Sequence, residues 1–440
     1  MNVQVRRAAA DVVATWLIDG TSPRDAMAAS PSLRLLPSRE RAAIARLVAD
    51  TIAARRRLEF LVAGPRGLAA MPPPARAMTL VLAQAVWSDQ LLAAGASREL
   101  AANGIDVDFT PLVAASSSPA ADPGVPPPLA FARRHSLPDW FAERALLQFG
   151  DEAEAVVEAL AAPAPRTVRA NLLRVADRDE LARELAAAGI ATTPARHAPT
   201  ALHVHGDADL FATAAWQRGA FEQQDEASQL VAAVTAPPPG GKVLDLCAGN
   251  GGKTLALAAA LRNRGVVAAT DVHAGRLRGL RERARRAGAT NLQVYELTSG
   301  DWPEPVRMFA AHADRILVDA PCSGTGSWRR RPEARWSFDE VSLAAVAGTQ
   351  QALLRAAADA LRPGARLVYA TCSLLAAENE QQILALRAAR PALEPVRIAE
   401  ILGGAAAGPI ADATGTYLSL RPDRHGCDGF FAAVLRRPRG

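Results

Sequence analysis

The sequence predicts an α/β protein, with a doubly wound sheet in its C-terminal half preceded by a helical domain and a small α+β unit. From Gly241 onward, strand-like and helix-like segments alternate regularly, which is the pattern of a doubly wound sheet. Residues 1 to about 112 instead carry apolar residues at helical spacing. Between these two regions, short β-like runs flank one helical segment. These three observations define the expected fold class.

The N-terminal region is expected to be helical. One helix should open at Ser38-Arg39-Glu40, where Ser is a candidate N-cap and Glu lies in the first turn, and run to about Val62. Pro72-Pro73-Pro74 interrupts the pattern, and residues 75–92 resume an apolar helical period. Residues 114–128, rich in Ser, Pro and Ala, are typical of a linker. We therefore expect a first domain at residues 1–127 with this linker at its end.

The middle of the chain has a mixed pattern. Residues 137–161 are helical in pattern, whereas residues 167–172 and 203–205 are β-like, with a helix expected over about residues 179–188. A small α+β connector is therefore expected at residues 128–225, followed by the domain of the doubly wound sheet at residues 226–438.

Composition narrows the classes of function. The chain has 440 residues, enough for two or three domains, and its net charge of +5 favours a polyanionic partner. Nearly all of the positive charge is Arg, because Lys242 and Lys253 are the only lysines. Four cysteines do not make a disulfide framework, so a reducing cytoplasm is expected. No apolar run is long enough for a membrane span, and Asp11 breaks the apolar stretch behind Arg6-Arg7, so no export signal is expected.

A glycine-rich turn follows the first strand of the expected sheet. The strand-like residues 242–246 lead into Cys247-Ala248-Gly249-Asn250-Gly251-Gly252-Lys253-Thr254, and a helix is expected to begin near Leu255. A P-loop would need Gly at position 247, and a dinucleotide fingerprint would need Gly at position 254. An S-adenosylmethionine site remains, with Asp271, 20 residues past Gly251, accepting hydrogen bonds from ribose hydroxyls. The alternative is a tight structural turn followed by a surface Asp.

Two short strings hold half of the cysteines. They are Asp319-Ala320-Pro321-Cys322-Ser323-Gly324 and Thr371-Cys372-Ser373, and each follows an apolar, strand-like run. If these runs are neighbouring parallel strands, both thiols lie at the carboxyl edge of one sheet, where open α/β sheets bind ligands. Two thiols and a carboxylate there suggest covalent catalysis by cysteine. The alternative for any one of them is a buried small hydrophobe, which is how we interpret Cys247 and Cys427.

The order of these motifs resembles that of the RNA cytosine-5 methyltransferases of the RsmB/NOP family, particularly the bacterial ribosomal RNA enzymes. The resemblance covers about residues 128–438 and includes Gln224-Asp225-Glu226-Ala227-Ser228, Glu378-Asn379-Glu380 and Asp428-Gly429-Phe430-Phe431. It implies a Rossmann-like class I fold with S-adenosyl-L-methionine as the cofactor. The helical N-terminus is similar to the NusB-type RNA-binding domain of the same enzymes, by position as much as by residues.

The resemblance also implies roles for the residues of the two cysteine strings. Cys372 is then the nucleophile that adds to carbon 6 of cytosine, Cys322 assists release, and Asp319 contacts the base near N3. A rival assignment, suggested by the Pro-Cys string of DNA cytosine methyltransferases, makes Cys322 the nucleophile. Because an ordinary thiol is only a few per cent thiolate at neutral pH, the site must lower the pKa of the attacking cysteine, through nearby arginines or the positive sulfonium of the cofactor.

Cofactor contacts follow from the same resemblance. The expected set comprises the loop Cys247, Ala248, Gly249, Asn250, Gly251, Gly252 and Lys253, together with Asp271, Asp319 and, after the third strand, Asp301. The family loop usually has Ala-Pro where this chain has Gly249-Asn250, which exchanges a rigid residue for flexible ones but keeps Gly-Gly-Lys. Lys253 is expected to pair with the cofactor carboxylate or with the substrate.

Two arginine-rich segments bear on RNA binding. Trp328-Arg329-Arg330-Arg331 and Arg335-Trp336 follow the first cysteine string, and Arg with Trp would suit phosphates and stacked bases. The alternative is a solvated basic loop. The arginines between positions 276 and 286 are instead expected to form a solvated helix face.

The sequence therefore predicts an S-adenosylmethionine-dependent RNA cytosine-5 methyltransferase. Its target base must be unpaired or flipped out of the helix, because carbon 6 is inaccessible within a stack. By family analogy the expected substrate is 16S ribosomal RNA, with tRNA as the enzymatic alternative. A non-catalytic RNA-binding or ribosome-assembly factor on the same fold is the alternative from another class. No metal, no membrane and no obligate protein partner are expected.

Overall fold

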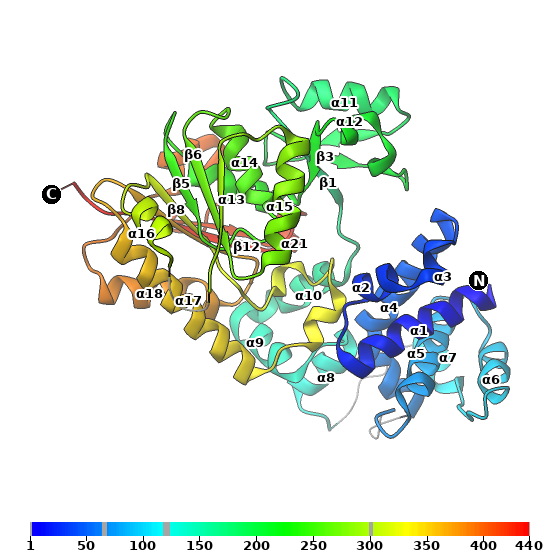
Figure 1. Cartoon of the computed structure of the whole chain (residues 1–440). Coiled ribbons are helices and arrows are strands. Elements are labelled where there is room, and N and C mark those ends of the chain that lie inside the picture. Colours follow the sequence, from blue (N-terminus) through cyan, green and yellow to red (C-terminus); the bar gives the residue numbers. More distant parts are fainter. Residues whose placement is uncertain (1, 64–67, 118–123, 299–301, 440) are drawn as a thin grey trace. The chain divides into compact units, whose positions relative to one another are not determined.

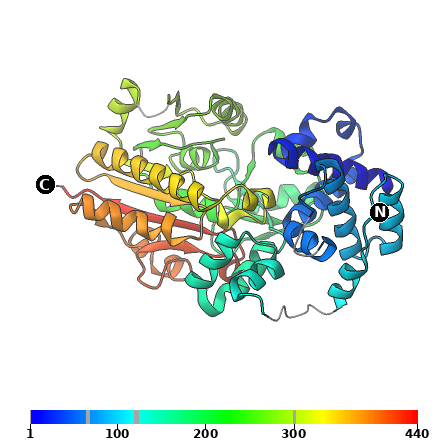
Figure 2. The ribbon, with the colours of Figure 1, turned by 90° about the horizontal axis from the view of Figure 1, so that it is seen from below.

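The computed structural model describes residues 2–63, 68–117, 124–298 and 302–439. The chain divides into two compact units, which Figures 1 and 2 show in two views. The helical unit comprises Met1–Ala161 and Trp328–Glu340, and the sheet unit comprises Ala162–Ser327 and Val341–Gly440. Among the described residues, no helix is long and apolar enough to cross a membrane.

The helical unit is built from helices throughout its described residues. These are α1 (Val3–Asp19), α2 (Pro23–Ala29), α3 (Pro31–Arg34), α4 (Ser38–Ala63), α5 (Pro73–Trp87), α6 (Ala93–Ala101), α7 (Thr110–Ser117), α8 (Pro127–His135), α9 (Asp139–Phe149), η2 (Gly150–Glu152), α10 (Ala153–Ala161) and η5 (Pro332–Trp336). Helix α4 opens at Ser38, as the sequence predicts. Helices α1, α4 and α5 share one core that includes Val13, Ile44 and Val81.

The first domain boundary differs from the expected one. Helices α8 to α10 belong to the helical unit, so the first boundary between the two compact units lies at Ala161 and not at residue 127. The physical reason is that α8 packs against α4 and α9, well upstream of the first strand. Of the expected linker, residues 118–123 lie outside the described residues, and the segments on either side of them are the helices α7 and α8.

The sheet unit begins with a small antiparallel sheet. Its strands lie in the order β2 (Thr192–Pro194), β3 (Ala201–Val204), β1 (Arg166–Ala170) and β4 (Phe221–Gln223), with α11 (Arg178–Ala187), η3 (Leu210–Ala212) and α12 (Ala214–Gln217) beside them. Leu181 and Leu185 of α11 pack on Val168 and Leu202 of the strands. The expected α+β character of this region is present, but it starts at β1.

The larger sheet is mixed. Its described strands lie in the order β10 (Glu394–Pro395), β12 (Phe430–Arg436), β9 (Arg366–Thr371), β8 (Arg315–Asp319), β5 (Lys242–Asp245), β6 (Val266–Asp271) and β7 (Leu292–Glu296), with β11 (Tyr417–Leu420) paired to β12. Strands β5 to β9 run parallel to one another, whereas β12 is antiparallel to β9. The strand order reverses at β5, between β8 and β6, which makes this the switch point where such sheets bind ligands.

Helices cover both faces of the larger sheet (Figure 1). They are α13 (Glu226–Thr235), α14 (Gly252–Ala260), α15 (Ala274–Ala287), α19 (Ile398–Leu402) and α20 (Gly404–Ala407) on one face, and α16 (Glu304–Ala310), α17 (Glu340–Ala360) and α18 (Glu380–Ala389) on the other. Val243 faces the first layer and Leu244 the second, because successive strand residues point to opposite faces. The predicted doubly wound sheet is therefore confirmed.

Candidate active site

The glycine-rich turn after β5 forms the first wall of the site. Gly249 and Gly251 have φ of +55° and +81°, in the left-handed region that favours glycine, and α14 begins at Gly252. A Cβ on Gly251 would lie 2.0 Å from Leu280 Cδ1, so a larger residue at this position would require the Leu280 side chain to shift. The backbone N–H of Gly249 donates to Asp271 Oδ2 at 2.9 Å. The structure thus brings together the loop and the carboxylate that the sequence singles out.

The loop is also held from the side of α15. Arg283 Nη1 donates to the carbonyl oxygen of Asn250 at 2.7 Å, while Nη2 of the same side chain is 2.7 Å from Glu222 Oε2. Glu222 lies on β4, is fully buried, and also pairs with Arg286. Gly249-Asn250 lacks the proline that is usual in the family, and this charged contact provides an external tie to the turn.

The two cysteine strings meet at the neighbouring strand ends. Strands β8 and β9 are parallel, and Cys322 Sγ lies 3.4 Å from Cys372 Sγ just beyond their carboxyl ends. Ser327 Oγ is 3.9 Å from Cys372 Sγ, and the backbone N–H of Gly326 donates to the carbonyl oxygen of Cys372 at 2.9 Å. The expected convergence of both thiols at one sheet edge is therefore observed.

The two thiols differ in acidity. The hydrogen bond from Cys322 lowers the pKa of Cys372, and the charge of Lys253 and the hydroxyl of Ser327 act in the same direction, against burial and Asp319. The same hydrogen bond, together with burial, raises the pKa of Cys322. Because the thiolate is the reactive form of a cysteine, these opposite shifts make the two thiols chemically unequal. Among the described residues, the positive charge that lowers the pKa of Cys372 is that of Lys253 and not of an arginine, while the expected contribution of the cofactor sulfonium stays a prediction.

Lys253 links the loop to the cysteines. Its Nζ lies 2.7 Å from Asp319 Oδ2 and 5.0 Å from the centre of the Phe430 ring. The expected partner was the cofactor carboxylate or the substrate, whereas the described structure pairs Lys253 with Asp319. Asp319 is 29% exposed in its side chain, so it is still open to a ligand at the edge of the sheet.

Asp245, at the end of β5, was not singled out from the sequence. It is fully buried, accepts a hydrogen bond from Thr254 Oγ1 at 2.6 Å, and its Oδ1 has no partner among the described residues. Burial raises its pKa to about 7. An Asp at the end of a strand pattern such as Val-Leu-Asp-Leu is the signal that could have identified it.

Three further candidates have different outcomes. Asp301 lies outside the described residues, so the acidic contact after the third strand stays a prediction. Burial raises the pKa of Cys247, the first residue of the loop, and its side chain packs against the core. Cys427 is 1% exposed within the core. Both fit the interpretation of these two cysteines as small hydrophobic residues.

The expected stacking role of the segment after the first cysteine string is wrong. Trp328 is fully buried, and its ring centre lies 4.5 Å from that of Phe141. Arg335 is 2% exposed and donates to the backbone oxygens of Ala53 and Ser136, while Trp336 Nε1 donates to that of Ile52. These side chains fasten residues 328–340 to the helical unit and are not available to bases or phosphates.

The arginines of α15 divide into two groups. The exposed ones are Arg276, Arg278, Arg281 and Arg285, as expected of a solvated helix face. Arg283 and Arg286 point inward to Glu222 instead. The sequence did not reveal this division because Glu222 lies about sixty residues away in the chain.

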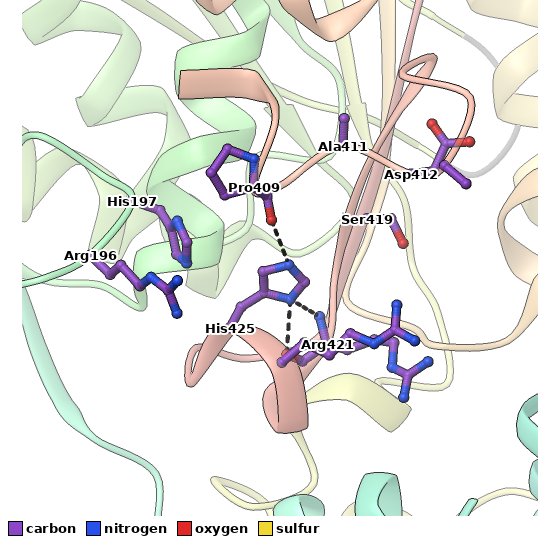
Figure 3. Close-up of a pocket in the computed structure, with 10 residues that line it drawn as sticks. Arg196, His197, Pro409, Ala411, Asp412, Ser419, Arg421 and His425 are labelled. Atoms are coloured by element: carbon purple, nitrogen blue, oxygen red, sulfur yellow. Dashed lines mark hydrogen bonds between the residues drawn. The ribbon is translucent and has the colours of Figure 1, made fainter. Parts of the chain in front are cut away.

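A separate pocket lies beside β11 and α21 (Pro422–His425), outside the cysteine site (Figure 3). Its volume is about 250 Å³, and it is lined by Arg196, His197, Pro409, Ala411, Asp412, Ala413, Ser419, Arg421, Arg424 and His425. His425 Nδ1 accepts from the backbone N–H of Arg421 at 2.9 Å, and Nε2 lies 3.0 Å from the carbonyl oxygen of Pro409. The imidazole of His425 thus ties two chain segments together.

The residues at the sheet edge fit the expected cofactor. No described atom outside the turn lies within 4 Å of a Cβ placed on Gly249, and the unpartnered oxygen of Asp245 lies at the end of the strand that leads into this turn. A ribose hydroxyl is a suitable donor to Asp271, and backbone N–H groups of the turn suit an anionic carboxylate. Together, the fold and the site define a Rossmann-like methyltransferase that depends on S-adenosylmethionine.

Comparison with known proteins identifies the family. The family described as 16S rRNA methyltransferase RsmB/F matches residues 232–436, and the ferredoxin-like domain of RsmF/B-like methyltransferases matches residues 137–210. The probable ribosomal RNA small subunit methyltransferase B of Synechocystis is 32% identical over 312 residues, which cover 70% of this chain and 68% of that protein. This chain belongs to the RsmB/NOP family of RNA methyltransferases.

Solved structures agree with this assignment. A methyltransferase homolog protein from Pyrococcus horikoshii is 28% identical, with a TM-score of 0.61, and the match covers 71% of this chain and 99% of that chain. NSun6 from the same organism, solved with SFG, has 22% identity and a TM-score of 0.58, covering 69% of this chain and 99% of that chain. The second likeness supports the fold alone.

Proposed function

We propose that this protein methylates carbon 5 of a cytosine in ribosomal RNA, and that Cys372 forms a transient covalent bond to carbon 6 of the base. The observation that carries the proposal is the pair of thiols 3.4 Å apart, with a lowered pKa for Cys372 and a raised pKa for Cys322. Carbon 5 of cytosine is a poor nucleophile, so a methyltransferase acting there needs such a thiolate. A methyltransferase that modifies an exocyclic nitrogen or a ribose hydroxyl has no such need.

The chain's own residues account for the chemical steps. Cys372 Sγ adds to carbon 6, and the electrons of the C5–C6 double bond make carbon 5 nucleophilic. The glycine-rich turn and Asp271 would hold S-adenosylmethionine, whose methyl group would bond to carbon 5 as its bond to the sulfonium sulfur breaks. Loss of the C5 proton then restores the double bond and breaks the bond between Cys372 and carbon 6. We assign assistance in this release to Cys322, and contact with the base near N3 to Asp319, which Lys253 orients.

Relatives support ribosomal RNA as the substrate. The relatives from Synechocystis and Vibrio cholerae carry the name ribosomal RNA small subunit methyltransferase B, and the second is 34% identical over 311 residues. We extend this substrate class, 16S ribosomal RNA, to the present chain. We also propose that the helical unit binds RNA, in the manner implied by its resemblance to NusB-type domains.

Labelled methyl transfer to RNA tests the chemistry. Cys372→Ala should abolish transfer, a loss on the order of a thousandfold or more. Cys322→Ala should accumulate a covalent RNA–protein adduct on a denaturing gel, because release is impaired. Cys427→Ala, in the core, is the matched cysteine control and should behave like the wild type. An adduct with Cys372→Ala instead would reverse the two roles, and wild-type protein without any transfer would favour a binding factor.

Bisulfite mapping of total RNA tests the substrate. A strain that lacks this protein should lose one 5-methylcytosine signal in 16S ribosomal RNA. Loss of a signal in tRNA would support the tRNA alternative. An unchanged map would contradict the cytosine-5 assignment, whichever RNA the protein binds.

A further inference from the structure

One buried carboxylate connects the residues that follow the two active-site cysteines. Glu378, in the turn η6 (Ala376–Glu378), is fully buried. Its Oε1 accepts hydrogen bonds from the backbone N–H of Ser323 at 2.8 Å and from Gln350 Nε2 at 3.1 Å. Its Oε2 accepts from Ser323 Oγ and Ser373 Oγ, both at 2.5 Å. The backbone N–H of Ser323 and the Nε2 group of Gln350 are donors, so this set of partners suits a carboxylate, which only accepts.

The partners of Glu378 are placed next to the reacting atoms. Ser323 directly follows Cys322, and Ser373 directly follows Cys372. The carboxylate therefore reaches the end of β8 through one serine and the end of β9 through the other. A change in the position of Glu378 would alter the distance between the two thiols, although Glu378 touches neither of them in the hydrogen bonds described.

A second layer fixes this arrangement. Thr325 Oγ1 lies 3.1 Å from Ser373 Oγ and accepts from the backbone N–H of Leu374. Asn379, next to Glu378, donates to the carbonyl oxygen of Ser373 at 2.9 Å and accepts from Thr371 Oγ1. Buried, mutually satisfied polar networks of this kind specify one geometry, because each lost partner leaves an unpaired buried group.

We propose that Glu378 is a positioning residue for the cysteine pair, which holds Cys322 as the hydrogen-bond donor to Cys372 and so sets which thiol is reactive. The inference rests on the proposed function, since it assigns a positioning residue to the same two thiols. It goes beyond that function because it attributes the difference in reactivity between Cys372 and Cys322 to a third residue, Glu378.

Charge supports the same role. The hydrogen bond to Cys372 and burial raise the pKa of Cys322 most, and the negative charge of Glu378 acts in the same direction. At an Sγ–Sγ distance of 3.4 Å, a protonated Cys322 can donate to a Cys372 thiolate. Glu378→Gln removes the charge and places an amide donor among groups that already donate. Both changes should make the two thiols more alike.

The experiment measures initial alkylation rates of both cysteines by iodoacetamide, with peptide mass spectrometry, in the full-length protein without RNA or cofactor. In the wild type, Cys372 should react faster than Cys322 at neutral pH. Glu378→Gln should lower the ratio of the two rates by about tenfold, which corresponds to one pKa unit. Ser373→Ala removes a single donor and should lower the ratio in the same direction by a smaller factor. Glu380→Gln, two residues away and outside the network, is the matched control with an unchanged ratio.

The outcomes separate positioning from simple support of the fold. The proposal would be overturned if Glu378→Gln lowered the midpoint of thermal unfolding but left unchanged both the ratio of the two alkylation rates and the pH dependence of alkylation. Glu378 would then contribute only to the stability of the fold. If Glu378→Gln does not fold, the ratio in Ser373→Ala decides. Since no methyl transfer is measured, the proposal can fail while the proposed function stands, and an altered ratio would support it even if the RNA substrate proved different.

Discussion

Two adjacent stretches of the chain, residues 319–327 and residues 328–336, show how differently short polar motifs behave. The first places Asp319 and Cys322 at an open sheet edge, whereas the second buries Trp328 and Arg335 within the helical unit. From the sequence, the first stretch was expected at the ligand-binding edge of the sheet, and the second was expected either to contact RNA or to form a solvated basic loop. The difference shows that the end of a strand determines the position of the next few residues. The position of a segment rich in Trp and Arg depends instead on contacts with residues that are distant in the sequence.

The partners explain the contrast. Cys322 and Cys372 lie together because β8 and β9 are neighbouring parallel strands. The alternation of strand-like and helix-like segments in the sequence predicts such a parallel arrangement. Arg335 instead contacts the backbone at Ala53, 282 residues earlier in the chain. No local pattern encodes such a pairing.

The largest expected effect tests the buried stretch. Trp328→Ala removes a fully buried indole packed on Phe141 and should destabilise the helical unit by about 3–5 kcal/mol, measured by thermal or denaturant unfolding. Arg331→Ala, at an exposed side chain paired only to Glu333 in the contacts described, is the neighbouring control and should change stability by less than about 1 kcal/mol. Weaker RNA binding by Trp328→Ala with unchanged stability would restore the stacking role and break the comparison.

The second effect contrasts two buried ionisable groups. The pKa of Asp245 is raised to about 7, so the folded state binds more protons than the unfolded state as pH rises from about 4 to about 7. Stability should therefore fall over this window, and Asp245→Asn should remove the fall, gaining on the order of a few kcal/mol above neutral pH. The pKa of Arg335 is lowered only to about 10, so it stays charged there. Denaturant unfolding at several pH values measures this, and parallel wild-type and variant curves would contradict it.

The third effect concerns the tie on the cofactor loop. Arg283→Ala removes one of the two arginine partners of buried Glu222 and the donor to Asn250, which should cost about 1.5–3 kcal/mol of stability. It should also weaken cofactor binding, measured by calorimetry. Arg285→Ala, exposed on the same helix, should stay within about 0.5 kcal/mol of the wild type. Equal effects of the two substitutions would mean that the loop does not depend on this contact.

The smallest effect concerns the acidity of Cys372. Lys253→Gln removes a charge that lowers the pKa of Cys372, so the pH profile of its alkylation should move to higher pH. The alkylation rate at neutral pH should fall by a factor of about two to five, within one pKa unit. Lys242→Gln, an exposed change at the only other lysine, should leave the profile in place. A profile shifted equally by both would assign the effect to net charge and not to the site.

Much of the fold could be predicted from the sequence, because the parallel strands, the glycine-rich turn and Asp271 follow local rules. The thiol pair could be predicted for the same reason. Glu378 belongs to one of the motifs that carry the family resemblance, but the sequence could not assign it a role. The four groups that donate to it come from the ends of two strands and from α17, which are separate in the sequence. The partners of Arg283 and the burial of Trp328 were likewise hidden, because each contact joins residues far apart in the chain.

The chain crosses between the two units three times, at Ala161–Ala162, at Ser327–Trp328 and at Glu340–Val341. The units are therefore interleaved in sequence, and no single cut separates them. A protein shortened to begin at Ala162 would keep Trp328 and Arg335 but lose Phe141, Ala53 and Ser136, the groups that receive them. Such a truncated methyltransferase would leave the indole of Trp328 and the guanidinium of Arg335, six and thirteen residues after Cys322 in the sequence, without the groups that bury them.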